Sequence, residues 1–357
     1  MNVGIVGCGV ISSRYATNAQ AFDAFDVVAC ADLDAEAAAI LAAAHDLDAL
    51  SVEDLLADPA IDVVLNLTPP AAHGAVLRQA LEAGKHVYSE KPLATTVAEA
   101  VELVADAGRR GLRVGCAPDI FLGSAYQAAR GLIDDGAIGE PLSASAAMLV
   151  GNQTSWHPNA DFFFADGAGP LLDMGPYYLT ALVALLGPVE RVAGYASTRV
   201  LERTIAVGPR AGERFAALTP THTAAMLELA DGVTAGLIAS FEATGQYVRE
   251  LEIHGTDGIL ALPDPNGFDG PLRLRQGKKE WRDVPYETRG DRDARGIGLA
   301  DLVDAIANDT PHRASAEMAL HVVDVARSIL AAAAEKRTVE VATSMSRPEP
   351  LPVAPSD

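Results

Sequence analysis

The first residues that could do chemistry form a glycine turn close to the N-terminus. Gly7, Gly9 and Ser12 make a G-x-G-x-x-S pattern between a short apolar run and a helical stretch. Gly7 allows a sharp turn, and Gly9 has no Cβ, so a pyrophosphate can approach the backbone there. The start of the following helix offers free N–H groups and the positive end of its dipole to the phosphates. A lone glycine pattern can be an ordinary turn, but this strand–turn–helix context predicts dinucleotide binding, with Val10 and Ile11 beside the phosphates.

An acidic residue at the end of the second apolar run would select the cofactor. Asp32 closes the run 26–31 and is followed by Leu33. At this point of a dinucleotide fold, a carboxylate accepts hydrogen bonds from the adenosine ribose, and its charge repels a 2′-phosphate. No Arg or Ser follows to receive such a phosphate, so we expect NAD to be preferred over NADP. The alternative is that Asp32 only caps the next helix, expected over residues 35–44.

Polar residues also follow the later apolar runs in the first third of the chain. Thr68 and Pro69 follow one run, Glu90 and Lys91 the next, and Asp119 comes shortly after a third. The runs alternate with helical segments of about 10–15 residues, which is typical of a doubly wound parallel sheet. Ligands of such a sheet lie at the carboxyl ends of its strands. We therefore expect one edge of the sheet to carry the cofactor-binding residues Thr68, Pro69, His73, Glu90 and Lys91.

Three of these motifs occur together in a known family. The glycine turn, the T-P-P-x-x-H sequence at 68–73 and the E-K-P sequence at 90–92 resemble the Gfo/Idh/MocA family, which includes glucose–fructose oxidoreductase and inositol dehydrogenase. The resemblance covers nearly the whole chain. It implies that Lys91 is a catalytic residue close to the nicotinamide and the reacting alcohol. The alternative for Lys91 is an ordinary surface lysine after a strand.

A second signature of this family lies in the middle of the chain, at Asp173. In the family an Asp is followed four residues later by His and, three further on, by another Asp. Here Tyr177 stands where His is usual, and Thr180 where the second Asp is usual. These departures argue against an inositol-type substrate, but a phenol near a cationic lysine and an oxidised nicotinamide can still be driven toward ionisation. The alternative is that Asp173 caps a helix and Tyr177 is a core aromatic residue.

The predicted chemistry is oxidation of a secondary alcohol, which requires a hydride acceptor, a base for the hydroxyl proton and groups that fix the ring. The resemblance assigns the acceptor to the nicotinamide. Lys91 would ease loss of the hydroxyl proton, Tyr177 would take or relay it, and Asp173 would orient a hydroxyl or the lysine. Such polar sets suit sugars, glycosides and cyclitols, which carry neighbouring hydroxyl groups. We expect this small polyhydroxylated substrate to contact Lys91, Asp119, Trp156, His157, Asp173 and Tyr177.

Two other functions fit the same residues. Some members of the family bind NAD(P) without turnover, so a non-enzymatic nucleotide-binding regulator of the same fold is one alternative. A dihydrodiol or keto-sugar reductase is the other. The presence of Lys91, Asp173 and Tyr177 together favours a dehydrogenase acting on CH–OH groups.

The length of the chain, 357 residues, is too great for one ordinary core, so we expect two domains. Residues 1–121 are predicted to form an NAD-binding Rossmann domain. Residues 122–340 are predicted to form an α+β domain with an open, mostly antiparallel sheet. By the resemblance, that sheet has one face toward the substrate and one toward another subunit, so we expect a homodimer or homotetramer. Residues 344–357 contain four prolines and are predicted to be a loose tail.

The composition restricts the partners and the compartment. The 27 basic and 48 acidic residues give a formal net charge of −21, which argues against nucleic acid or an anionic membrane surface as a partner. No apolar stretch approaches the length of a membrane span. Cys8, Cys30 and Cys116 form no C-x-x-C pair and are interpreted as reduced cysteines of a cytoplasmic protein. The eight His residues show no zinc-site spacing, so no metal is expected.

Overall fold

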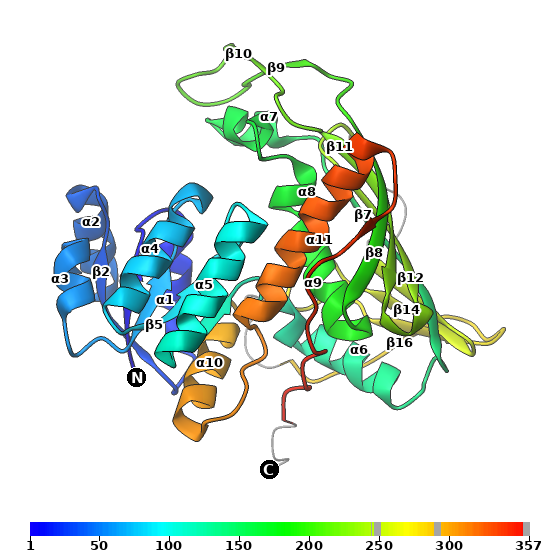
Figure 1. The fold of residues 1–357 in the computed structure, drawn as a ribbon, viewed down its shortest axis with the longest axis horizontal. Coiled ribbons are helices and arrows are strands. Elements are labelled where there is room, and N and C mark those ends of the chain that lie inside the picture. The colour runs from blue at the N-terminus through cyan, green and yellow to red at the C-terminus, as the bar shows by residue number, and fades with distance from the viewer. Residues whose placement is uncertain (244, 246–250, 289–293, 353–357) are drawn as a thin grey trace. The chain divides into compact units, whose positions relative to one another are not determined.

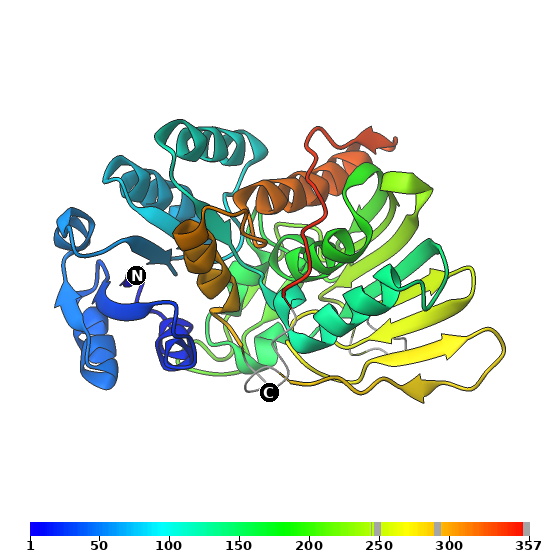
Figure 2. The same ribbon diagram turned by 90° about the horizontal axis from the view of Figure 1, so that it is seen from below.

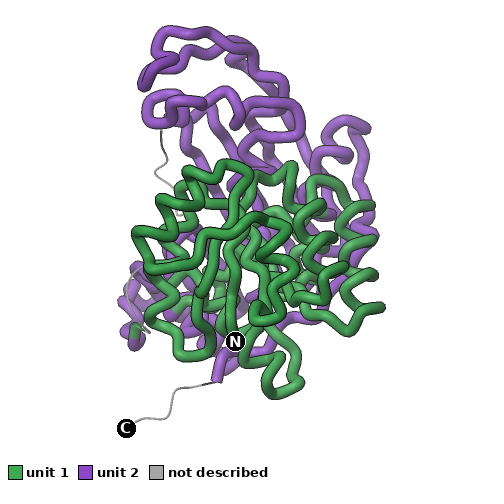
Figure 3. The backbone as a smooth tube through the Cα atoms, turned by 90° about the vertical axis from the view of Figure 1, so that its left-hand side faces the viewer, with its two compact units in different colours: residues 1–123, 288–323 green, residues 124–287, 324–357 purple. Residues whose placement is uncertain are grey.

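The computed structural model describes residues 1–243, 245, 251–288 and 294–352. The chain divides into two compact units, each built from two separate stretches of sequence (Figure 3). Unit 1 comprises Met1–Gly123 and Thr288–Val323, and unit 2 comprises Ser124–Glu287 and Asp324–Asp357. The first boundary lies close to the predicted one after residue 121. The second differs from the prediction, because Thr288–Val323 belongs to unit 1 and not to the substrate domain.

Unit 1 contains a parallel sheet. Its strands are β1 (Asn2–Val6), β2 (Asp26–Ala31), β3 (Asp48–Leu50), β4 (Val63–Asn66), β5 (His86–Ser89) and β6 (Val114–Cys116). In the described part of unit 1 they pair in parallel in the order β3-β2-β1-β4-β5-β6, which confirms the predicted doubly wound arrangement. The connecting helices, labelled in Figure 1, are α1 (Ser12–Ala19), α2 (Ala35–His45), α3 (Val52–Ala57), α4 (Pro70–Glu82) and α5 (Val97–Arg110).

The strands of this sheet are apolar runs because both of its faces are covered. All four residues of β4 are buried, although successive side chains of a strand point to opposite faces. The short elements β3 and α3 go beyond the prediction. With three and six residues, they are too short to show a clear hydrophobic period.

The segment that returns to unit 1 extends the edge of the sheet at β6. Gly115 forms an antiparallel bridge with Ser315, and the Cys116 N–H donates to the Ala314 carbonyl oxygen at 2.9 Å. Arg113 forms an ion pair of 3.0 Å with Asp309, just after α10 (Ile297–Asn308). These contacts explain why the segment belongs to unit 1, although it follows unit 2 in the sequence.

Unit 2 contains a larger mixed sheet. Its strands are β7 (Pro141–Leu149), β8 (Val189–Ser197), β11 (His222–Leu229), β12 (Thr234–Ser240), β13 (Leu251–Gly255), β14 (Gly258–Leu262), β15 (Arg273–Gln276), β16 (Arg282–Asp283) and β17 (Val339–Glu340). Among the described residues they pair in the order β16-β15-β14-β13-β7-β12-β11-β8-β17, all antiparallel except β7 with β12. A separate hairpin pairs β9 (Glu202–Thr204) with β10 (Arg214–Ala216). Asp231 and Gly232, a dipeptide typical of hairpin turns, connect β11 to β12, and both residues have positive φ (60° and 77°).

In the described part of unit 2, helices cover one face of this sheet and leave the other open. The helices of unit 2 are α6 (Ser124–Asp134), α7 (Gln153–Trp156), α8 (Pro170–Asp173), α9 (Gly175–Leu186) and the second part of α11 (Ala316–Glu335). Several of them follow one side of the green and yellow strands in Figure 2. On that side Ala225, Leu227 and Leu237 are buried, and a Cβ on Gly194 would lie 2.9 Å from the carbonyl oxygen of Ile329 in α11. The opposite face carries exposed apolar side chains.

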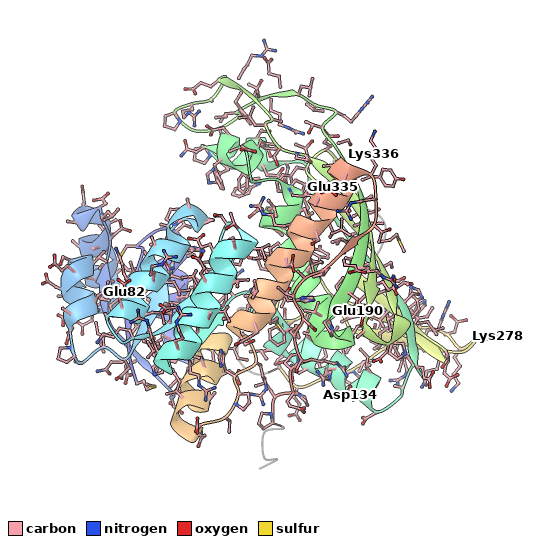
Figure 4. The ribbon with its side chains drawn as sticks, viewed as in Figure 1. Glu82, Asp134, Glu190, Lys278, Glu335 and Lys336 are labelled. Atoms are coloured by element: carbon pink, nitrogen blue, oxygen red, sulfur yellow. The ribbon has the colours of Figure 1, made fainter. Side chains whose placement is uncertain are left out.

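The C-terminal segment is held against unit 2 as far as residue 352, which differs from the predicted loose tail. The Arg130 guanidinium on α6 donates to the Pro348 carbonyl oxygen at 2.6 Å, and the Leu351 N–H donates to Gln127 Oε1 at 2.7 Å. Arg347 pairs at 2.8 Å with Asp134, which is labelled in Figure 4. Side chains of α6 therefore satisfy the backbone of the tail. Residues 353–357 of the predicted tail lie outside the described residues.

A buried carboxylate joins β6 to α10 inside unit 1. Asp119 is 2% exposed, and its Oδ2 accepts the backbone N–H groups of Gly296 at 3.3 Å and Gly298 at 2.9 Å. Burial raises the pKa of Asp119 to about 6; the Gly298 N–H opposes this rise, and the nearby charge of Glu90 adds to it. Asp119 is therefore occupied within unit 1, which does not support the prediction that it contacts a substrate.

This burial predicts a pH dependence of stability that Asp119→Asn reduces. The pKa in the folded state, about 6, lies above the ordinary value of 3.8, so the native state binds more protons between these values. The free energy of unfolding should therefore fall as pH rises from about 4 to about 6, by roughly 2–3 kcal/mol for this group. Urea denaturation at several pH values should show a smaller fall for Asp119→Asn than for the wild type. Asp309→Asn, at an exposed ion pair, serves as the control; equal profiles for wild type and Asp119→Asn would contradict the prediction.

Candidate cofactor site and acid–base residues

The glycine turn after β1 has the shape that a dinucleotide requires. Gly7 has a φ of +102°, and a Cβ there would lie 2.6 Å from the backbone of Leu67 and Thr68, so only glycine fits. A Cβ on Gly9 would meet no atom within 4 Å, which leaves open space for a ligand beside its backbone. No side chain caps the start of α1 at Ile11. The turn therefore offers both free space and uncapped helix N–H groups to a pyrophosphate.

Asp32 is held against this turn by backbone donors. Its Oδ2 accepts the Cys8 N–H at 2.7 Å, and its Oδ1 accepts the Asp34 N–H at 2.9 Å. The cap of α2 is Asp34, whose side chain accepts the N–H groups of Glu36 and Ala37, so the alternative that Asp32 caps this helix is wrong. Each carboxylate oxygen of Asp32 can accept a further hydrogen bond, and ribose hydroxyls are suitable donors.

Two apolar side chains, one in the glycine turn and one directly after Asp32, are open to solvent. Val10 in the glycine turn and Leu33 after β2 are 101% and 99% exposed. Large apolar residues with full exposure have no packing role inside the protein. Together with the position of Asp32, they fit a site that a flat adenosine group would cover.

The strand end of β4 is tied to the strand end of β5 by His73. This ring is 1% exposed, and its Nδ1 and Nε2 lie 2.6 Å and 2.7 Å from the carbonyl oxygens of Pro92 and Thr68. The Thr68 hydroxyl donates to Asn66 Oδ1 at 2.7 Å. Both ring nitrogens of His73 therefore contact backbone carbonyl oxygens, and the ring joins two loops, which does not support the prediction that it contacts the cofactor. Pro69, by contrast, is exposed at the start of α4.

Glu90 and Lys91 follow β5 at the same edge of the sheet. The Lys91 N–H donates to Glu90 Oε2 at 3.1 Å, and the Glu90 N–H donates to the Asn66 carbonyl oxygen at 2.9 Å. Both residues are only partly buried. Since β1, β2, β4 and β5 are parallel, their carboxyl ends bring the glycine turn, Asp32, Thr68 and Lys91 to one edge of the sheet.

The predicted acid–base residues of unit 2 lie at the junction of two helices. Asp173 is the last residue of α8, and Tyr177 is in the first turn of α9; both are partly exposed. The N-cap position of α9 is Met174, and no side chain caps it, so Asp173 is not a helix cap here. The core aromatic residue of this turn is Tyr178, at 2% exposed, and Thr180 is equally buried. Both alternatives for Asp173 and Tyr177 are therefore disfavoured.

Trp156 and His157 belong to an aromatic cluster of unit 2. The Trp156 ring lies 5.3 Å from that of His157 and 5.7 Å from that of Phe163, and the His157 ring lies 5.0 Å from that of Phe162. Trp156 is 55% exposed. The cluster thus presents an aromatic face on unit 2, and a ring contact of Trp156 or His157 with substrate stays a prediction.

Two general features complete the description of the site. Within the described ranges of the chain, no group of three or more His, Cys, Asp or Glu side chains is arranged to hold a metal ion. In the same ranges, no helix combines the length and the apolar character needed to cross a bilayer.

Comparison with known proteins identifies both parts of the chain. Residues 1–117 match the family described as "Oxidoreductase family, NAD-binding Rossmann fold", and residues 126–261 match the "GFO/IDH/MocA C-terminal domain". Trans-1,2-dihydrobenzene-1,2-diol dehydrogenase of Bos taurus is 30% identical over 301 residues, which are 83% of this chain and 84% of that protein. The 1,5-anhydro-D-fructose reductase of Ensifer adhaerens is 29% identical over 267 residues, 72% of this chain and 74% of that protein.

A solved structure shows the same fold around a bound cofactor. Levoglucosan dehydrogenase in complex with NADH and L-sorbose is 25% identical and superposes with a TM-score of 0.84, over 96% of this chain and 99% of that one. The glycine turn, the fixed Asp32 and the strand-end lysine fit the cofactor that these matches imply. The chain belongs to the Gfo/Idh/MocA family of NAD-binding oxidoreductases.

Proposed function

We propose that this protein is an NAD-dependent dehydrogenase that transfers a hydride between a secondary alcohol of a sugar, glycoside or cyclitol and the nicotinamide. The observation that carries the proposal is the position of Lys91, fixed through Glu90 at the sheet edge that also holds the glycine turn and Asp32. Relatives named for levoglucosan, D-xylose and 1,5-anhydro-D-fructose support a polyhydroxylated ring as the substrate.

Each of the site residues has a separate role in this reaction. When bound, the cofactor accepts or donates the hydride. Asp32 receives the ribose hydroxyls, and the glycine turn leaves room for the pyrophosphate. The Lys91 ammonium stabilises the alkoxide character of the reacting oxygen, and the Tyr177 hydroxyl takes or relays the proton. Asp173 orients a neighbouring hydroxyl of the ring.

Reduction of a keto-sugar is the second candidate, because it is the same reaction in reverse. The relative from Ensifer adhaerens is named as a reductase of this kind. The experiment that tests both directions is a screen of levoglucosan, D-xylose and myo-inositol with NAD, and of 1,5-anhydro-D-fructose with NADH. Absorbance of reduced nicotinamide reports turnover. The absence of turnover with every compound would favour the regulator alternative.

The open face of the unit 2 sheet supports a homo-oligomer. Ala224 pairs with Tyr195 on one side and Ile238 on the other, so these side chains share one face with Met226. Tyr195, Met226 and Ile238 are 81%, 56% and 38% exposed. An apolar sheet face of this kind is usually covered by a second subunit.

We also place the protein in the cytoplasm, since its three cysteines are unpaired.

The first prediction from this proposal concerns the choice of cofactor. The negative charge of Asp32 beside the glycine turn should make NADH bind more tightly than NADPH, because it repels the 2′-phosphate. Asp32→Ser should narrow the difference between the two dissociation constants. The two dissociation constants are measured by adding each reduced cofactor to the protein and following the intrinsic fluorescence. Equal binding of NADH and NADPH by the wild type would refute the role of Asp32.

The second prediction concerns Lys91 and Tyr177. Lys91→Met keeps much of the side-chain volume and removes the ammonium, so kcat should fall by roughly 10²–10⁴-fold while NADH binding stays nearly unchanged. Tyr177→Phe should cause a comparable loss if the phenol carries the proton, and the two losses should not add in the double variant. Near-native turnover by Lys91→Met would overturn the catalytic assignment. If Tyr177→Phe leaves kcat unchanged, Lys91 is the only acid–base group of the two.

The third prediction concerns assembly. Light scattering at micromolar concentration should give the mass of a dimer or tetramer, and Met226→Glu should shift it toward a single subunit, because the charge lies in the centre of the open face. Ile40→Glu, at an exposed position on α2 of unit 1, is the matched control and should leave the mass unchanged. A single-subunit mass for the wild type would contradict the proposal.

A further inference from the structure

A buried tyrosine with no role in the proposed mechanism contacts Glu90, the residue that precedes Lys91. Tyr15 is on α1, the helix that follows the glycine turn, and it is 3% exposed. Its hydroxyl donates to Glu90 Oε1 at 2.9 Å. In the sheet, β4 lies between β1 and β5. The Tyr15 side chain therefore reaches from the helix that follows β1 to the residue that follows β5.

The Glu90 carboxylate is held at two points. Its Oε1 receives the Tyr15 hydroxyl, and its Oε2 receives the backbone N–H of Lys91 at 3.1 Å. One contact comes from α1, the helix that follows the glycine turn, and the other from the backbone of Lys91. The carboxylate therefore connects the cofactor turn to the residue that handles the proton.

The charges around Tyr15 determine that its hydroxyl is the donor in the hydrogen bond with Glu90. Burial, with the charge of Glu90 as the next cause, raises the pKa of Tyr15 well above its ordinary value, so the phenol keeps its proton and donates. Tyr88 and Asp119, which are also buried, lie near enough to add to this shift. A hydrogen bond to a charged acceptor in such surroundings is stronger than one in water.

We propose that Tyr15 is a positioning residue for Lys91, acting through Glu90 and coupling the cofactor turn to the catalytic lysine. The proposal rests on the proposed function only in that Lys91 is the acid–base group. Tyr15 itself is only 3% exposed, and its hydroxyl contacts the Glu90 carboxylate. Its contribution is to hold the Glu90 carboxylate so that the Lys91 backbone stays in one position during turnover.

The direct test is amide hydrogen exchange of Lys91 in the full-length protein. Tyr15→Phe removes one hydroxyl and leaves Glu90 with a single anchor, so the Lys91 amide should exchange roughly tenfold faster. NADH binding, followed by fluorescence, should stay within about twofold of the wild type, which shows that the unit is folded. Unchanged exchange at Lys91 in a folded Tyr15→Phe protein would overturn the proposal.

The matched control is Tyr126→Phe in unit 2. Tyr126 is fully buried, and its hydroxyl donates to the Pro263 carbonyl oxygen at the same distance of 2.9 Å. This variant loses a comparable buried hydrogen bond far from the E-K-P sequence in the chain. It should lower the melting temperature as Tyr15→Phe does, without changing Lys91 exchange. Faster Lys91 exchange in both variants would mean general loosening and would also overturn the proposal.

Kinetics separate positioning from packing. With saturating NAD and an alcohol from the screen above, Tyr15→Phe should lower kcat roughly tenfold and change KM less than about twofold. The double variant Tyr15→Phe/Glu90→Gln should lose little more than Glu90→Gln alone, because both changes break one chain of contacts. Fully additive losses would contradict an action through Glu90. If Lys91→Met keeps turnover, the proposed function fails, whereas the exchange experiment still decides whether Tyr15 positions this residue.

Discussion

The cofactor edge of unit 1 depends on one close approach between two backbones. At Gly7 the chain passes so near to Leu67 and Thr68 that a Cβ would lie 2.6 Å from their backbone atoms. This approach directs the turn so that the Cys8 N–H reaches Asp32 and α1 carries Tyr15 toward Glu90. A larger residue at position 7 would therefore disturb the contact of Cys8 with Asp32 and the contact of Tyr15 with Glu90 together.

Much of this architecture could be predicted because it depends on neighbours in the sequence. The Asp231-Gly232 turn has positive φ at both residues, a conformation that this dipeptide favours locally. The strand ends that carry Asp32, Thr68 and Lys91 follow from the apolar runs alone, because every strand of a parallel sheet has its carboxyl end at the same edge. Local pattern therefore suffices wherever the fold repeats one simple unit.

Contacts between segments that are far apart in the sequence cannot be predicted from local patterns. His73 and Asp119 have the residue types of binding groups, but both are buried and occupied by backbone partners that the sequence pattern does not reveal. Tyr15 is the reverse case, because nothing in the sequence marks it as a site residue. In the sequence it is one aromatic residue of a short helix, and only the fold shows that its hydroxyl contacts Glu90. The return of Thr288–Val323 to unit 1 likewise depends on pairing with β6 across most of the chain.

That return has a consequence for synthesis of the protein. A chain that has left the ribosome only as far as Gly123 contains the glycine turn and β1–β6, but Gly115 and Cys116 still lack Ser315 and Ala314 as backbone partners. The Asp119 carboxylate also lacks the N–H groups of Gly296 and Gly298. Leaving these groups unpaired in a closed core is costly. The nucleotide-binding unit, although first in the sequence, is therefore completed only after Ser124–Glu287, the larger stretch of the other unit, has been translated.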